Sequence, residues 1–308
     1  MEQLMTLTCT HCGKTIQIPQ GLETFSCLYC GEKMSLADFA PREAQIADEE
    51  DRAYAEEHFI DVVASYPDYF RNFGRRTYTD SFFAYKEGIE PIFQAMNRYV
   101  CAKPDQWQAL LDHFVSRFLQ DWERFYSQDR RWKHRSSRNA MLFDAKLTLA
   151  WYTVPAILDL KLPIGEDLTR TLREQFLEHY PDNPFEIGTF QDISEGFRKK
   201  KLCFITTAVC AHEGKPDDCE ELTAFRSFRD GWLSQTQDGR ALIEEYYRLA
   251  PVLVTAMTYA SDGKTPYETL RRDYLDPCSR LLQQGQMEEC KQTYVNMVRA
   301  LQAQYHVS

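Results

Sequence analysis

Two cysteine pairs near the start of the chain constrain its fold more than any other feature. Cys9 and Cys12 lie in the segment CTHCG, and Cys27 and Cys30 lie in CLYCG after fourteen intervening residues. A CxxC turn directs two thiolates toward one tetrahedral ion, and two such turns complete its coordination. The glycine after each pair relieves crowding where backbone amides bend toward the sulfur atoms. The spacing therefore predicts one structural Zn²⁺ ion held by these four cysteines.

The segment between the pairs, KTIQIPQGLETFS, alternates apolar and polar residues on either side of Pro19–Gly21. This alternation predicts a short hairpin. With the two cysteine motifs, the segment resembles a zinc ribbon over roughly residues 5–38, so we expect a ribbon domain over 1–40. Four thiolates leave no open coordination position, so the ion serves folding rather than catalysis. They also leave no place for His11, which we expect at the surface.

Charge limits the partners of such a chain. The net charge is −10 and the isoelectric point is about 5.3, and an acidic protein is repelled by phosphate backbones unless its basic residues are concentrated locally. The ribbon itself carries few basic residues, mainly Lys14 and Lys33, against Glu23, Glu32 and Asp38. We therefore expect the ribbon to bind protein or to cap the next domain.

Composition and periodicity predict helices for the rest of the chain. The 308 residues include only 13 glycines and 13 prolines, which disfavours a turn-rich β architecture. Apolar residues recur at helical spacing from Trp107 to Trp122, a second helix is expected from Glu166 to His179, and an apolar segment ends near Pro155. The predicted fold class is mostly α: a helical bundle over 41–198, preceded by a small β zinc ribbon.

Charged clusters punctuate this region. An acidic run over 43–57 is typical of a solvated helix face or a linker. Basic residues gather at 130–138, around Trp132 and His134, and again at 198–201. Either cluster could hold phosphates, with Trp132 stacking on a base, or could pair with the acidic run. Nucleic-acid binding through the ribbon and the 130–138 cluster is thus one hypothesis.

The apolar run KLCFITTAVC, residues 201–210, carries a thiol near each end. Three interpretations remain open. Cys203 could be a nucleophile with His212 as its base; Cys203, Cys210, His212 and Cys219 could surround a second metal ion; or the run could be core. The third is favoured because Phe204 and Ile205 indicate burial, where a thiol is inert. The chain contains no glycine-rich phosphate loop, HExxH motif or GxSxG motif.

The sequence after this run predicts two helices in a hairpin, separated at Gly239, with the second reaching toward Pro251. Over about 200–260 the chain resembles the CFI-box C-terminal domain, a bacterial module found as a C-terminal appendage on varied proteins. The resemblance implies no established activity. The matching residues, in order, are Cys203–Ala208, Phe225–Arg226, Phe228–Asp230, Leu233, Gly239–Arg240, Ile243, Tyr246–Tyr247 and Pro251. We expect this helical domain to occupy 199–308.

The end of the chain predicts a helix from Tyr267 to Leu275, ending at Asp276–Pro277, and then a long amphipathic stripe from Leu281 to Tyr305. The stripe packs back on the bundle or binds a second copy of the chain. No apolar run is long enough for a bilayer, and MEQLMTLTCT does not have the pattern of a signal peptide, so we expect a cytoplasmic protein. The leading hypothesis is a non-enzymatic adaptor that binds protein partners; the cysteine-dependent enzyme and nucleic-acid hypotheses are its alternatives.

Overall fold

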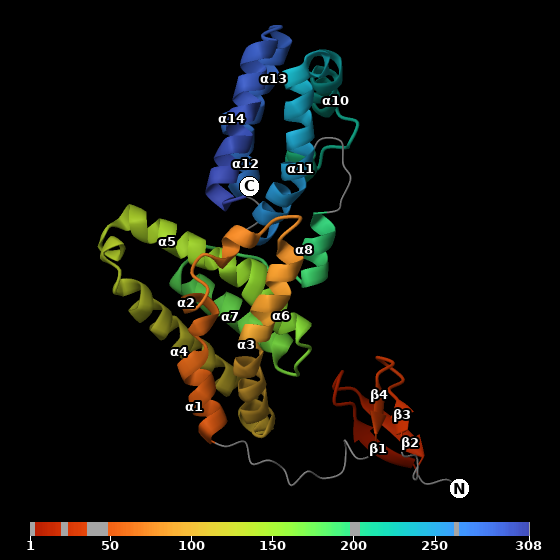
Figure 1. The fold of residues 1–308 in the computed structure, drawn as a ribbon, viewed down its shortest axis with the longest axis vertical. Coiled ribbons are helices and arrows are strands. Elements are labelled where there is room, and N and C mark those ends of the chain that lie inside the picture. The colour runs from red at the N-terminus through yellow and green to blue at the C-terminus, as the bar shows by residue number, and fades with distance from the viewer. Residues whose placement is uncertain (1–3, 20–23, 36–48, 198–203, 262–264, 308) are drawn as a thin grey trace.

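The computed structural model describes residues 4–19, 24–35, 49–197, 204–261 and 265–307 (Figure 1). In these ranges, the strands lie before residue 36 and the helices follow from Glu49 onward. The predicted fold class, mostly α with a small N-terminal β region, is confirmed. No helix in the described part of the chain is both long and apolar enough to cross a membrane.

The N-terminal region consists of two antiparallel hairpins. Strand β1 (Leu4–Thr8) pairs with β2 (Thr15–Pro19), and β3 (Thr24–Ser26) pairs with β4 (Lys33–Ser35). The predicted hairpin across Pro19–Gly21 is therefore wrong, because β2 and β3 each pair with the outer strand of their own half. The reason is that each CxxC turn reverses the chain within a few residues and is itself the turn of a hairpin.

Two long helices form the middle of the N-terminal bundle. Helix α3 (Tyr78–Cys101) packs against α1 (Glu49–His58), and α4 (Trp107–Ser127) packs against α7 (Gly165–His179). The apolar stripe predicted for α4 is confirmed, since its residues from Leu111 to Trp122 line the core. The remaining elements of the bundle are α2 (Asp61–Ala64), α5 (Arg135–Thr148), α6 (Val154–Asp159) and α8 (Phe190–Gly196). Short 3₁₀ turns lie at Tyr69–Asn72, Pro104–Gln106 and Arg130–Lys133.

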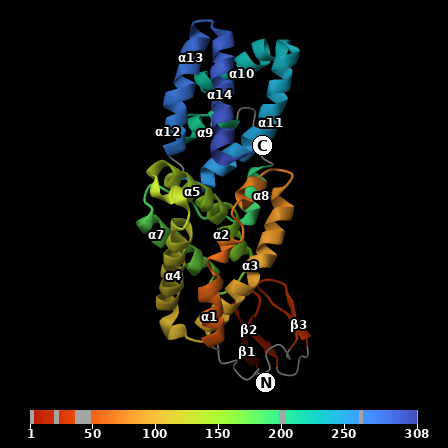
Figure 2. The same ribbon diagram turned by 60° about the vertical axis from the view of Figure 1, so that its left-hand side comes forward.

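The C-terminal helices lie beyond the bundle along the long axis of the helical region (Figures 1 and 2). They are α9 (Phe204–His212), α10 (Glu220–Ser227), α11 (Gln237–Tyr259), α12 (Thr265–Leu270), α13 (Asp276–Gln283) and α14 (Met287–Tyr305). A 3₁₀ turn at Leu233–Gln235 precedes α11. The predicted stripe over 281–305 is divided, because Gly285 has a left-handed φ of 73° between α13 and α14. The α14 side chains of Met297, Leu301 and Tyr305 are buried within the chain's own core.

Prolines that were expected to end helices lie inside continuous helical segments. The chain stays helical through Pro155 and Pro277, each of which follows a π-helical turn, Leu149–Thr153 and Arg271–Leu275. A proline lacks an N–H and its ring clashes with the carbonyl four residues earlier. At Pro155 that carbonyl belongs to Trp151, and it accepts a buried hydrogen bond of 2.7 Å from the hydroxyl of Tyr78. The helix thus continues because α3 supplies the donor that proline lacks.

One apolar core joins the bundle to the C-terminal helices and runs from Ala55 to Val307. Buried polar contacts reinforce this junction: Lys146 donates from Nζ to the carbonyl of Ala260 over 2.8 Å, and His306 lies 2.9 Å from Asp144. The expected boundary between 41–198 and 199–308 falls on residues outside the described ranges and stays a prediction. The ribbon has a separate core of Cys9, Ile16, Ile18, Cys27 and Met34.

A close backbone approach at the start of α11 generates a stability prediction. A Cβ at Gly239 would overlap the carbonyl oxygen of Leu233, whereas one at Gly231 would meet nothing within 4 Å. Gly239→Ala should therefore destabilise the protein by about 2 kcal/mol in urea unfolding, as overpacking does. Gly231→Ala is the matched control and should change stability by less than about 0.5 kcal/mol. Equal effects of the two substitutions would contradict this account.

Candidate functional site

The four cysteines of the ribbon converge on one point. Their Sγ atoms all lie within 4.8 Å of one another, with Cys9 and Cys30 3.8 Å apart and Cys12 and Cys27 3.6 Å apart. A tetrahedral ion with metal–sulfur bonds of about 2.3 Å has sulfur–sulfur edges of about 3.8 Å. The donor set therefore fits a tetrahedral, thiolate-binding metal ion, as the sequence spacing predicts.

The two turns hold their sulfurs by the same backbone pattern. Gly13 N–H donates to the carbonyl of Cys9, and Gly31 N–H donates to that of Cys27, both over 2.9 Å. Both glycines adopt a left-handed φ, 69° and 74°, which residues with a side chain rarely adopt. Backbone N–H groups also point at sulfur, from Cys12 to Cys9 Sγ and from Tyr29 to Cys27 Sγ. This explains why a glycine follows each pair.

The thiols of the cluster influence one another's ionisation. Burial opposes ionisation of Cys27, but hydrogen bonds from the backbone of Cys30 and Tyr29 and from neighbouring thiols lower its pKa to about 6. A backbone hydrogen bond from Glu32 favours ionisation of Cys30, yet burial and the other thiols raise its pKa to about 12. Ionisation of one thiol thus disfavours ionisation of its neighbours. A bound cation would allow all four thiols to be deprotonated together.

The apolar run of the sequence forms α9, which is buried in the C-terminal helices. Ile205 and Thr206 have no exposed surface, and the Ile205 N–H donates to the hydroxyl of Tyr246 over 3.0 Å. The hydroxyls of Thr206 and Tyr294 are 3.0 Å apart, and that of Tyr294 donates to Tyr246. Much of the motif that resembles the CFI box therefore holds α9 against α11 and α14. Cys203 lies outside the described residues.

Of the other residues of the hypothetical second metal site, Cys219 packs beside Cys210 and Leu222, but His212 lies apart from them. Cys210 is fully buried beside Leu222, whereas His212 is exposed against the ring of Tyr267. Among the described residues, Cys210, His212 and Cys219 do not form a group of three close ligand atoms. Phe204 and His212 begin and end α9, about 12 Å apart along its axis. The pairing of His212 with Cys203 stays a prediction.

An ion-pair cluster lies beside Cys210. The guanidinium of Arg271 binds both Glu213 and Glu221, and Lys215 also lies within 3.1 Å of both carboxylates. Glu221 lies 3.7 Å from the sulfur of Cys210. Burial, and then the charge of Glu221, raise the pKa of Cys210 to about 12, so this thiol stays protonated at neutral pH.

The basic cluster at 130–138 is less available than its sequence suggests. Arg131 forms an ion pair with Asp129 at 2.7 Å. The ring of Trp132 is stacked on Tyr126, and the guanidinium of Arg138 lies 6.0 Å from its centroid. The Trp132 indole, which the nucleic-acid hypothesis would stack on a base, is thus packed against the protein's own side chains. The second basic cluster, 198–201, lies outside the described residues.

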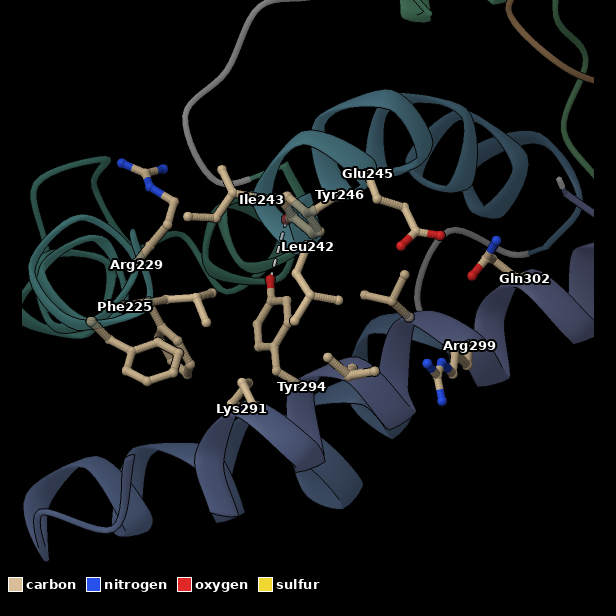
Figure 3. Close-up of a pocket in the computed structure, with 14 residues that line it drawn as sticks. Phe225, Arg229, Leu242, Ile243, Glu245, Tyr246, Lys291, Tyr294, Arg299 and Gln302 are labelled. Carbon is tan, nitrogen blue, oxygen red and sulfur yellow. Dashed lines mark hydrogen bonds between the residues drawn. The ribbon is translucent and has the colours of Figure 1, made fainter. Parts of the chain in front are cut away.

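The described residues also form a groove that the sequence analysis missed. It is a shallow groove with a cavity volume of about 100 Å³ between α10, the π-helical turn Phe228–Trp232, α11 and α14. Figure 3 shows Leu242 of α11 facing Tyr294 of α14 across the groove, with the carboxylate of Glu245 on the side of Gln302. The full lining consists of Phe225, Phe228, Arg229, Leu233, Leu242, Ile243, Glu245, Tyr246, Lys291, Tyr294, Val295, Val298, Arg299 and Gln302. A sequence signal existed, because these apolar residues are spaced as a second face on α11 and α14.

The groove has an apolar floor and a partly basic rim. Tyr246 and Tyr294 form the floor, where their hydroxyls bond each other and α9. On the rim, Arg229 is paired with Asp230 and Lys291 with Glu288. Arg299 is exposed and forms no ion pair with any described residue. Glu245 adds a carboxylate to the same rim, so a ligand of this groove would bring apolar groups together with charged groups of both signs.

Comparisons with family models, with curated proteins and with solved structures find no match for this chain. The resemblance to the CFI-box domain is carried by the residues described above, and the geometry of α9, α10 and α11 gives those residues a packing role. Function must accordingly be argued from the metal centre and the groove.

The separate cores of the ribbon and the helices predict a selective effect of metal loss. Native mass spectrometry should count one zinc ion per chain, and Cys12→Ser should remove it. Helical circular dichroism and its melting temperature should not change, because the helical core contains no ribbon residue. Two zinc ions per chain, or loss of helicity after chelation, would contradict this assignment.

The Arg271 cluster predicts a pH-dependent contribution to stability. Burial disfavours the charged forms of Glu213 and Glu221, but Arg271 and Lys215 lower both pKa values below 4.5. A lowered carboxyl pKa stabilises the fold above its unfolded value and loses that effect as the pH falls. Arg271→Met should cost about 2 kcal/mol at pH 7, less than a fully buried pair, and this difference should shrink below about pH 4.5.

Arg272→Met is the control for this substitution. Arg272 is the next residue, it is exposed, and among the residues that the structure describes its ion pair is with its neighbour Asp273. Removing such a surface pair should change the free energy of unfolding by less than about 0.5 kcal/mol at either pH. Urea unfolding at pH 7 and pH 4 measures both variants, and a pH-independent effect of Arg271→Met would disprove the role assigned to the carboxylates.

Proposed function

We propose that this protein is a non-enzymatic adaptor that binds a protein partner in the groove between α11 and α14, with a zinc ribbon as a separate second module. The observation that carries the proposal is the set of apolar side chains left on the groove walls. Leu242, Ile243 and Val295 are half-buried, yet they do not belong to the shell of side chains packed on the main core. Contiguous apolar surface of this kind is typical of a binding site.

The shape and charge of the groove favour one kind of partner. Its long walls are two helices, and such grooves accept the apolar face of an amphipathic helix. Arg299 adds a charge at the rim that a carboxylate of the partner would neutralise. We therefore propose an amphipathic helix with aliphatic anchors and at least one acidic residue as the bound element.

Chemistry at the other candidate sites favours binding over catalysis. Four thiolates saturate the coordination of a tetrahedral ion, so the metal, which we propose to be Zn²⁺, supports the ribbon fold and offers no open position to a substrate. The raised pKa of Cys210 removes it as a nucleophile at neutral pH. Membership of the CFI-box family and a cytoplasmic location are part of the same proposal, since reduced cysteines require a reducing compartment.

Charge substitution in the groove tests the proposal. Val295→Asp places a carboxylate on the apolar wall, and Asn296→Asp, its neighbour on α14, places the same charge on exposed surface outside the groove. Wild type and Asn296→Asp should capture the same partner from host extract. Calorimetry with the purified partner should show Val295→Asp binding about tenfold or more weakly, a loss of about 1.4 kcal/mol.

Two results would overturn the adaptor function. In the first, Val295→Asp binds every captured partner as tightly as wild type does, which would exclude the groove. In the second, the purified protein captures no partner while the same material turns over a substrate. Rapid alkylation of Cys203 by iodoacetamide would then favour the alternative enzyme hypothesis, because a buried thiol reacts slowly.

A further inference from the structure

A second cavity, of about 440 Å³, lies where the segment before α3 meets the middle of α11. Arg71, Arg75 and Arg76 reach it from the segment before α3, and Arg248 reaches it from α11. Its remaining lining is Phe73, Gly74, Thr77, Leu249, Val252 and Val307. The lining thus combines four exposed arginines with an apolar floor, and the cavity volume falls within the range of about 300–1,000 Å³ found for small-molecule sites.

The arginines of this cavity differ from most others in the protein. Elsewhere, arginines such as Arg98, Arg117 and Arg271 are each neutralised by a nearby carboxylate. In the cavity, Arg71 pairs with Asp68 at 3.0 Å, but Arg75, Arg76 and Arg248 form no ion pair within the described part of the chain. Three arginines without an ion pair among the described residues therefore line one cavity in a protein whose net charge is −10. A bound anion would reduce the repulsion between such like charges.

The floor beneath these charges is fixed by packing. Phe73 is stacked on Trp151 with ring centroids 4.0 Å apart, and Leu249 and Val252 are almost fully buried. The segment that carries Arg75 and Arg76 is held at both ends, because Thr77 donates from its hydroxyl to the carbonyl of Asn72 over 2.8 Å and Tyr78 N–H donates to Gly74. A ligand would thus meet a preformed surface bordered by exposed charged side chains.

We propose that this cavity binds a small organic phosphate of the nucleotide class. Guanidinium groups match phosphate oxygens in geometry and charge, and several of them together favour a multiply charged group over a single carboxylate. The apolar floor suits the ring portion of such a molecule. Phosphate recognition here uses arginine side chains rather than a glycine-rich loop, so the site carries no phosphate-loop motif in the sequence. The proposal is independent of the groove between α11 and α14.

Binding should also stabilise the whole helical part of the chain. Arg75 and Arg76 belong to the N-terminal bundle, whereas Arg248 belongs to the C-terminal helices. A phosphate held by both groups bridges the two parts, and a ligand that binds only the folded state raises the melting temperature.

The experiment measures the melting temperature and calorimetric affinity of the full chain with ADP, inorganic phosphate and adenosine as probes. The test variant is Arg75→Gln/Arg76→Gln/Arg248→Gln. The control, Arg130→Gln/Arg135→Gln/Arg138→Gln, removes the same charge from the exposed cluster at 130–138. Wild type and control should bind ADP saturably and be stabilised by it, and the test variant should bind it at least about tenfold more weakly. Adenosine should not bind measurably.

Three outcomes would overturn the proposal. ADP that neither binds nor stabilises wild type at about 10 mM would exclude a nucleotide site of useful affinity. Equal ADP affinity in wild type and the test variant would place binding elsewhere on the chain. Inorganic phosphate binding as tightly as ADP would show that the apolar floor adds nothing, and the cavity would then be a simple anion site. Circular dichroism of the variants, whose replaced arginines are exposed, verifies that they fold.

Discussion

The packing of Trp151 is the interaction on which the rest of the helical structure depends. Its ring lies between Phe73, which forms the floor of the arginine-lined cavity, and Tyr305, at the end of the last helix. Its carbonyl, displaced from the regular helical pattern ahead of Pro155, accepts the hydroxyl of Tyr78 at the start of α3. One residue thereby connects the two ends of the helical region to its centre, and the C-terminal helices share the core of the bundle rather than forming a separate one.

Helix α11 connects the two proposed sites. Leu242 and Glu245 in its first half line the groove shared with α14, and Arg248, one turn later, lines the arginine-lined cavity. The same helix holds α9 through the hydroxyl of Tyr246, so the motif that resembles the CFI box lies beneath the groove. Residues that look like a catalytic segment in the sequence are in this way a support for the walls of the groove.

Several expectations failed for physical reasons that are local to the fold. The π-helical turns before Pro155 and Pro277 cannot be recognised from the spacing of apolar residues. The hydroxyl that donates a hydrogen bond to the Trp151 carbonyl belongs to Tyr78, 73 positions earlier in the chain. Strand pairing in the ribbon was misassigned because alternation identifies strands but does not say which strand is the neighbour. The groove and the cavity escaped notice because each is built from segments far apart in the sequence, and single arginines carry no signal of where they meet.

Features that depend on residues close together in the chain can be predicted from the sequence. The CxxC spacing and the following glycines specify the candidate metal centre, because the two sulfurs of each pair come from a single turn of the chain. The helical periodicity specifies the apolar stripe on α4. The tertiary structure sets the features that depend on which helix surfaces contact each other. It buried Cys210 beside Glu221 and Arg271, packed Trp132 on Tyr126, and placed Arg75, Arg76 and Arg248 around one cavity with no ion pair to any described carboxylate. Burial and long-range contact set the charge state and accessibility of these groups, and neither is encoded in local spacing.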